Sequence, residues 1–350
     1  MCGEGQQRGR VNLKILIEET LKEEAANLLA GNDVVLFATH EDDRAAITAK
    51  AQGADSMVLR WPLTFPVDAE FLAACPDLKH VHKSGSGLEH ADVLHIDACT
   101  QAGVMFSNNA GLNADVVAEH AILLTLMAMR PDTLTHMNRL REGHWDAAPA
   151  ADVPRPRTLV GKTVGIVGLG QIGTCVAARM QAMRVGRILG YQRTRRFEQA
   201  YFAGVEWVDL RELLETSDVI VLCLPLSPAT TGLISRELVA AIKPDAVLVN
   251  VGRGGVIDEA ALFEAVRDGR IASVGLDVLE VEPSDSPLMK LPNAFVTPHT
   301  AGTAVEMQQI QRQAAVEAAA EFARRRRPPR LVNPQVLRSA ALRAGWLGAD

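Results

Sequence analysis

One stretch, residues 162–196, constrains the fold of this chain more than any other. It begins with an apolar segment typical of a short strand, breaks at Gly168, and continues as a helical pattern. Gly168, Gly170 and Gly173 form G-x-G-x-x-G. Between a strand and a helix, these glycines permit a tight turn, let the backbone approach a pyrophosphate, and let the helix pack closely on the strand. The stretch therefore predicts a dinucleotide site; the alternative is a plain glycine turn.

The helix expected to start near Gln171 would present the backbone N–H groups of Gln171 and Ile172 to an anion. A second strand ends roughly 20 residues later, where an NAD site normally carries an acidic residue for the ribose hydroxyls. The positions at and after the end of that strand are Gln192, Arg193, Thr194, Arg195 and Arg196. A neutral amide followed by arginines suits a 2′-phosphate better than a free hydroxyl, which favours NADP(H), with NAD(H) as the other possibility. The alternative is that these arginines form a solvated loop.

Composition restricts the remaining classes of function. The length of 350 residues suits two or three domains, and a net charge of −6 argues against general nucleic-acid binding. No apolar run reaches the ~18 residues needed to cross a membrane, and residues 1–10 lack the apolar segment of a secretory signal. The five cysteines are scattered, which indicates reduced thiols in a cytoplasmic protein and predicts no metal site.

Strand and helix patterns alternate along the chain, which predicts parallel, helix-covered sheets. Strands are expected near residues 11–17, 34–37, 57–59, 78–81, 104–106, 162–167, 188–191, 219–222, 246–249, 272–275 and 294–296, and helices near residues 19–29, 69–74, 116–129 and 305–323. The helix at 116–129 is apolar nearly all round, which predicts burial on most sides.

Four further motifs follow one another along the sequence. They are residues 85–92 (GSGLEHAD), 250–258 (NVGRGGVID), 275–283 (GLDVLEVEP) and 297–302 (TPHTAG). Together with the glycine turn they closely resemble the D-isomer-specific 2-hydroxyacid dehydrogenase family, over about residues 12–335.

The resemblance implies two α/β domains, each a Rossmann- or flavodoxin-like doubly wound parallel sheet. A dinucleotide-binding domain, residues 113–300, would be inserted into a substrate-binding domain formed by residues 1–112 and 301–350. It also implies an active site between the domains and a homodimer with the helix at 116–129 in the interface.

The family's catalytic Arg, Glu and His match Arg253, Glu282 and His299. Their chemistry agrees with reduction of a 2-oxo acid: a guanidinium binds the carboxylate with two parallel hydrogen bonds and polarises the ketone. A histidine can donate a proton to the developing alkoxide, and a carboxylate orients the imidazole and favours its charged form. Each of the three follows an expected strand, at the sheet edge where ligands bind. Taken singly, each residue could instead be a surface or capping residue.

The resemblance assigns further residues to ligands. The backbone of Ser86 and Gly87 matches the loop that receives the substrate carboxylate, and Asp277 matches the residue that binds the nicotinamide carboxamide. Lys83 either contacts a substrate oxyanion or is an exposed lysine. The remaining cofactor positions are Leu224, Pro225, Val251, Gly252 and Gly302.

These observations predict an NADPH-dependent reductase of a small 2-oxo acid such as glyoxylate or hydroxypyruvate. The alternatives are a dehydrogenase of another 2-hydroxy acid, such as phosphoglycerate, and a non-catalytic dinucleotide sensor. The partners expected are the small-molecule substrate and a second copy of the chain, with no nucleic acid and no membrane.

Overall fold

The computed structural model describes residues 12–38, 42–60, 65–87, 94–145, 154–193 and 204–344. The chain folds into two compact units: unit 1 is Met1–Leu112 with Val305–Asp350, and unit 2 is Asn113–Ala304. Residues 301–304, expected in the first domain, group with unit 2, where the Ala301 N–H binds the Asp277 carboxylate. Within the described ranges, no helix is long and apolar enough to cross a membrane.

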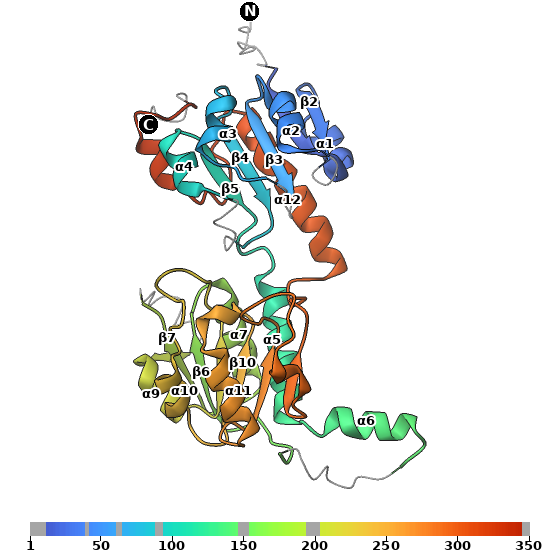
Figure 1. Ribbon diagram of the computed structural model, residues 1–350, viewed down its shortest axis with the longest axis vertical. Coiled ribbons are helices and arrows are strands. Elements are labelled where there is room, and N and C mark those ends of the chain that lie inside the picture. Colours follow the sequence, from blue (N-terminus) through green and yellow to red (C-terminus); the bar gives the residue numbers. More distant parts are fainter. Residues whose placement is uncertain are drawn as a thin grey trace, which may run out of the picture. The chain divides into compact units, whose positions relative to one another are not determined.

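Unit 1 contains a five-stranded parallel sheet in the order β2-β1-β3-β4-β5 (Figure 1). This is the flavodoxin-like strand order. The last long helix, α12, returns to this unit and packs on β3 and β4. Its elements are β1 Lys14–Glu18, η1 Glu19–Leu21, α1 Lys22–Leu28, β2 Asp33–Phe37, α2 Arg44–Ala51, β3 Ser56–Arg60, α3 Ala69–Ala74, β4 His80–Ser84, α4 Ile96–Gln101, β5 Met105–Asn108, α12 Val305–Ala323 and η4 Pro334–Arg338.

Unit 2 contains a seven-stranded parallel sheet in the order β12-β11-β10-β9-β6-β7-β8. The order reverses between β6 and β9, which is the switch point where Rossmann sheets bind dinucleotides. Its elements are α5 Ala114–Met129, α6 Thr133–Arg141, β6 Thr163–Val167, α7 Gln171–Ala182, β7 Arg187–Tyr191, β8 Val205–Trp207, α9 Leu210–Thr216, β9 Val219–Leu222, α10 Arg236–Ala241, β10 Val247–Asn250, η2 Gly254–Val256, α11 Glu259–Arg267, β11 Ser273–Leu276, η3 Pro287–Lys290 and β12 Ala294–Val296.

Helices cover both faces of the sheet in unit 2, which explains why its central strands are mostly apolar. Side chains of α5 and α7 form one apolar core with the sheet, and side chains of α9, α10 and α11 form the other. Strands β9 and β10 are buried at every position. Burial on both faces is the usual condition of a parallel sheet.

Two features of the fold differ from the sequence analysis. The helix expected at residues 19–29 is divided into η1 and α1, and β8 was not predicted, because three residues are too few to show a period. Helix α5 is buried on most sides, as expected, and its exposed residues, which include Leu123 (49% exposed) and Leu126 (37%), lie on one face. These two leucines lie on the face of α5 turned away from the core of unit 2.

Candidate active site

Glycine is favoured in the turn after β6 for two different reasons. Gly168 has φ +97°, and a Cβ on Gly173 would lie 2.1 Å from the Gly168 carbonyl oxygen. The fold itself therefore excludes side chains at these two positions. A Cβ on Gly170 would meet no described residue within 4 Å. Packing against the described part of the chain does not demand glycine there, whereas a ligand close to the backbone would.

Helix α7 begins beside this turn. Its N-cap is Gly170, and no side chain caps the helix. The first-turn N–H groups of Gln171 and Ile172 thus suit an anion such as a pyrophosphate. The residues present therefore fit a dinucleotide at the switch point.

The residues at the end of β7 are the candidates for contact with the ribose. The Gln192 Oε1 atom is buried, and none of the described residues donates a hydrogen bond to it. A buried acceptor requires a donor, and a ribose hydroxyl would serve. Arg193 is exposed, whereas Thr194 and Arg195 lie outside the described residues.

The three candidate catalytic residues follow adjacent strands. Arg253 follows β10, Glu282 follows β11 and His299 follows β12. Because these strands are parallel neighbours, their carboxyl ends meet at one edge of the sheet, where ligands bind in open α/β folds.

Glu282 and His299 form a hydrogen bond, with 2.6 Å between Glu282 Oε2 and His299 Nδ1. The other carboxylate oxygen of Glu282 accepts a hydrogen bond from the Leu279 N–H at 3.1 Å. An ionised carboxylate only accepts, so the Nδ1–H of the histidine donates. Nε2 remains to exchange a proton with a ligand.

The turn that carries Arg253 is shaped by Asn250, the last residue of β10. The Asn250 side chain donates to the Arg253 carbonyl and accepts from the Gly252 N–H, both at 3.0 Å. A Cβ on Gly254 would lie 1.9 Å from the Leu279 carbonyl carbon. The Arg253 turn thus packs directly against the segment that leads to Glu282.

Asp277 holds the turn that contains His299. His299 has φ +53°, an uncommon conformation for a residue other than glycine, and its N–H donates to the Asp277 carbonyl at 2.8 Å. The next two N–H groups, of Thr300 and Ala301, donate to the Asp277 carboxylate at 2.9 and 3.0 Å. These bonds fix the backbone on the C-terminal side of the histidine.

The same carboxylate connects to α5. Asp277 is 2% exposed and accepts a third hydrogen bond from the Thr297 hydroxyl at 2.7 Å. The distance between His120 Nε2 and the Thr297 hydroxyl oxygen is 2.9 Å. His120, which gave no catalytic signal in the sequence, is thus hydrogen-bonded beneath the His299 turn.

The candidate substrate loop lies in unit 1, after β4. Lys83 is 4% exposed, and its Nζ donates to the Gly87 carbonyl at 2.5 Å. The Asn108 side chain donates to the Ser86 carbonyl at 3.0 Å. The alternative of an exposed lysine is therefore wrong: Lys83 is buried and holds the loop through a carbonyl.

The remaining cofactor candidates follow strands β9, β10 and β12 of unit 2. A Cβ on Gly252 would lie 2.5 Å from the Leu224 carbonyl oxygen, and Val251 is 4% exposed, so the turns after β9 and β10 pack closely. Pro225 follows Leu224, and its carbonyl accepts from the Thr230 hydroxyl. A Cβ on Gly302 would lie 2.8 Å from the Asn113 side chain.

Sequence reasoning gave no role to Asn250, Thr297 or Glu259, although all three shape this edge of the sheet. An Asn beside a glycine turn is a known turn signal and could have indicated Asn250. Thr297 bonds to His120 and Asp277, and Glu259 accepts hydrogen bonds from residues 280 and 286. These partners are at least 20 residues away, so no local pattern points to them. Of the described His, Cys, Asp and Glu residues, no three form a group suited to a metal ion.

Comparison with known proteins identifies the family. The profile of the D-isomer specific 2-hydroxyacid dehydrogenase NAD binding domain matches residues 122–301. A glyoxylate reductase of Pyrococcus furiosus is 32% identical over 331 residues, covering 93% of this chain and 96% of that protein. A crystal structure of a glyoxylate reductase from Paecilomyes thermophila superposes with a TM-score of 0.80 at 27% identity, covering 93% of this chain and 99% of that one.

The fold and these matches define a nicotinamide-binding α/β protein. The chain belongs to the D-isomer specific 2-hydroxyacid dehydrogenase family. A D-3-phosphoglycerate dehydrogenase of Mycobacterium leprae is 38% identical over 295 residues, 84% of this chain. The chain spans only about half the length of such relatives, 54% in that case.

Proposed function

We propose that this protein reduces a small 2-oxo acid to the D-2-hydroxy acid with a nicotinamide cofactor, preferably NADPH. The observation that carries the proposal is the 2.6 Å pair of His299 and Glu282 beside a dinucleotide-binding edge. Three features support the cofactor: the glycine turn, and, among the described residues, the lack of a side-chain cap on α7 and of a hydrogen-bond donor to the Gln192 oxygen.

The cofactor, when bound, supplies the hydride for reduction and accepts it in the reverse direction. His299, protonated and held through Nδ1 by Glu282, donates a proton from Nε2 to the developing alkoxide. Arg253 binds the substrate carboxylate and polarises the ketone, since a guanidinium offers paired donors in one plane. We also propose the backbone N–H groups of Ser86 and Gly87 as donors for the carboxylate.

Glyoxylate and hydroxypyruvate are the substrates we favour, because relatives named glyoxylate reductase match this chain along most of their own length. The relatives named phosphoglycerate dehydrogenase favour a phosphorylated acid as the second candidate. An assay of glyoxylate, hydroxypyruvate, pyruvate, phenylpyruvate and phosphohydroxypyruvate with both cofactors tests the proposal. Turnover of a 2-oxo acid supports it, whereas cofactor binding without turnover of any would indicate a dinucleotide sensor.

Cofactor choice should depend on the residues after β7. Gln192 lacks the negative charge that would repel a 2′-phosphate, and each hydrogen bond to such a charge contributes roughly 1.5–3 kcal/mol. We expect kcat/KM to favour NADPH by about ten- to several-hundredfold. Gln192→Asp combined with Arg193→Ala should erase or reverse this preference. Equal kcat/KM values of the wild-type enzyme for the two cofactors would contradict the assignment.

Removing the charge of Glu282 should change the pH dependence of reduction. Glu282→Gln keeps an oxygen that can accept from Nδ1–H but no longer stabilises the imidazolium. We expect the pH at which activity is lost to move downward, and kcat to fall by roughly five- to tenfold. The measurement is kcat against pH for both enzymes, and superimposable profiles would remove Glu282 from the mechanism.

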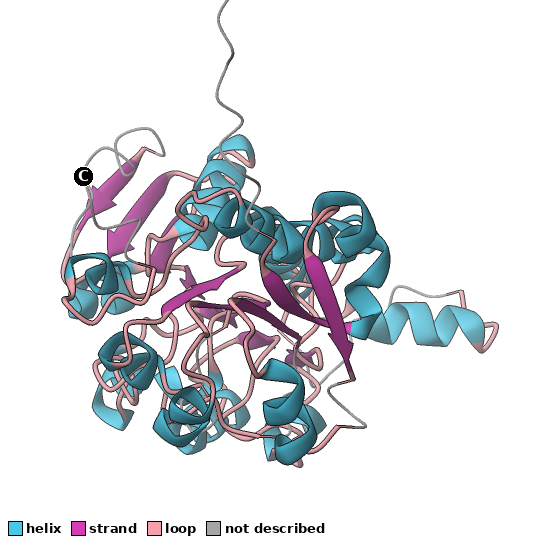
Figure 2. Cartoon of the chain, turned by 90° about the horizontal axis from the view of Figure 1, so that it is seen from above, coloured by secondary structure: helices cyan, strands magenta, loops and turns pink. Residues whose placement is uncertain are grey.

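The protein is expected to form a homodimer through the face of α5 and α6. No residue of α6 is buried, and the side chains of Leu134, Met137 and Leu140 are 43–45% exposed at a spacing of three residues. Figures 1 and 2 both show α6 extending away from the rest of unit 2. Light scattering after size exclusion should give the mass of two chains. Leu134→Glu with Met137→Glu should give one, whereas a monomeric wild-type protein would contradict the assignment.

A further inference from the structure

The segment that carries Glu282 runs from the end of β11 to η3 and is mostly outside the core. Its two ends are buried, with Leu279 8% exposed and Ser286 5%. Glu280, Val281, Glu282 and Pro283 are all exposed. Packing therefore fixes the ends of the segment but not the position of the carboxylate between them.

Glu259 contacts this segment at two places. One carboxylate oxygen accepts a hydrogen bond from the Glu280 N–H at 2.7 Å, and the other accepts from the Ser286 hydroxyl at 2.6 Å. The two donors lie two residues before Glu282 and four residues after it. A single carboxylate thus connects both sides of the exposed segment.

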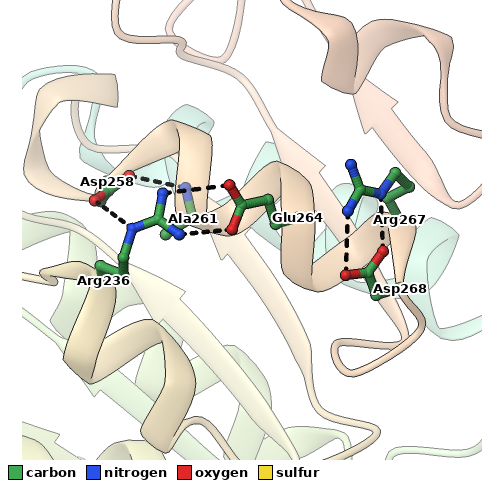
Figure 3. A network of polar contacts seen from close by, with 6 residues as sticks. All are labelled: Arg236, Asp258, Ala261, Glu264, Arg267 and Asp268. Carbon is green, nitrogen blue, oxygen red and sulfur yellow. Dashed lines mark hydrogen bonds and ion pairs between the residues drawn. The ribbon is translucent and has the colours of Figure 1, made fainter.

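Glu259 is itself well placed to act as an anchor. It is the first residue of α11, whose N-cap, Asp258, accepts a hydrogen bond from the Ala261 N–H at 2.8 Å. Arg236 lies 3.9 Å from Asp258 and 2.6 Å from Glu264, which is six residues further along the chain (Figure 3). The helix end that presents Glu259 is therefore held independently of the Glu282 segment.

We propose that Glu259 is a positioning residue, which holds the segment 279–286 so that Glu282 stays in line with His299. The inference rests on the proposed catalytic role of Glu282. Substrate and cofactor need not touch Glu259, because it acts through the segment. An ångström of misplacement at a catalytic pair can reduce a rate by about 10²-fold.

The test is a double-mutant cycle. Glu259→Ala should lower kcat by about 10- to 100-fold, change the KM values little, and move the loss of activity to lower pH, as in Glu282→Gln. Glu259→Gln retains one acceptor oxygen and should be intermediate. The double variant Glu259→Ala, Glu282→Gln should be no slower than the slower of the two single variants, because both changes act on one pair.

Two further variants serve as controls. Asp268→Asn removes an acid from the other end of the same helix, where it faces Arg267 instead of the segment, and it should leave kcat and the pH profile unchanged. Ser286→Ala removes one of the two contacts and should lower kcat less than Glu259→Ala. This variant also tests the inference if Glu259→Ala fails to fold.

The outcomes separate the two assignments. An effect of Glu282→Gln with none of Glu259→Ala would overturn the inference alone. The inference would also be overturned if the fold-losses in kcat of the two single variants multiplied in the double variant and the pH profile of Glu259→Ala were unchanged. That result would indicate a structural role for Glu259. No effect of Glu282→Gln would instead overturn the catalytic proposal on which it rests.

Discussion

Replacing His299 by alanine is expected to lower kcat by about 10²–10⁴-fold, the usual contribution of a general acid. Its Nδ1 is bound to Glu282, so Nε2 is the atom available to donate the proton. The dissociation constant of the cofactor should change little, because three strands of the sheet lie between β12 and β6, whose glycine turn would hold the pyrophosphate. The measurements are single-turnover reduction rates and cofactor titration.

Added imidazole supplies the matched control for His299→Ala, since it should restore part of the rate if a proton donor is missing. His144→Ala removes an exposed histidine and should leave kcat unchanged. A His299→Ala enzyme that keeps more than about a tenth of the wild-type kcat would contradict the assignment.

Unit 1 is expected to lose about 3 kcal/mol of stability between pH 7.5 and pH 5.5 because it buries two neutral histidines. His80 and His82 are fully buried in β4. Their ring nitrogens bond to the Ser56 and Ser107 hydroxyls at 2.8 Å. Burial lowers the pKa of His80 far below its ordinary value, and burial, with a smaller effect of Arg330, lowers the pKa of His82 to about 3.

The direction of this effect follows from proton binding. Below about pH 6.5 the unfolded chain protonates both histidines, whereas the folded unit does not. The unfolded state then binds more protons, so stability is complete above pH 6.5 and falls as the pH falls, by up to about 1.4 kcal/mol per pH unit for each histidine. The carboxylates with lowered pKa in this unit, such as Asp68, contribute only at lower pH.

Hydrogen exchange of β4 and β5, corrected for the intrinsic effect of pH, measures this loss. Strands β9 and β10 of unit 2 contain no histidine and provide an internal reference. His82→Gln should halve the pH dependence in unit 1, and His144→Gln should leave it unchanged. Protection in β4 that is independent of pH from 7.5 to 5.5 would contradict the prediction.

The fold class was predictable from the sequence because its signals are local. Apolar runs bounded by turns located most strands of both sheets, and G-x-G-x-x-G located the switch point between β6 and β9. Glycine conformation and strand burial are properties of a few consecutive residues. The order of the motifs then indicated the family, which the comparisons confirmed.

Only the tertiary structure decided the contacts between residues that are far apart in sequence. Glu282 and His299 are 17 residues apart, and only the adjacency of β11 and β12 brings the two side chains to 2.6 Å. The burial of Lys83 and the exposure of Leu123 on an apolar helix likewise depend on what packs on each face. The sequence by itself thus determined which residue types stand at the ends of the strands. The pairing of the strands decided which of these side chains meet, because hydrogen bonds act over a few ångströms of space regardless of separation along the chain.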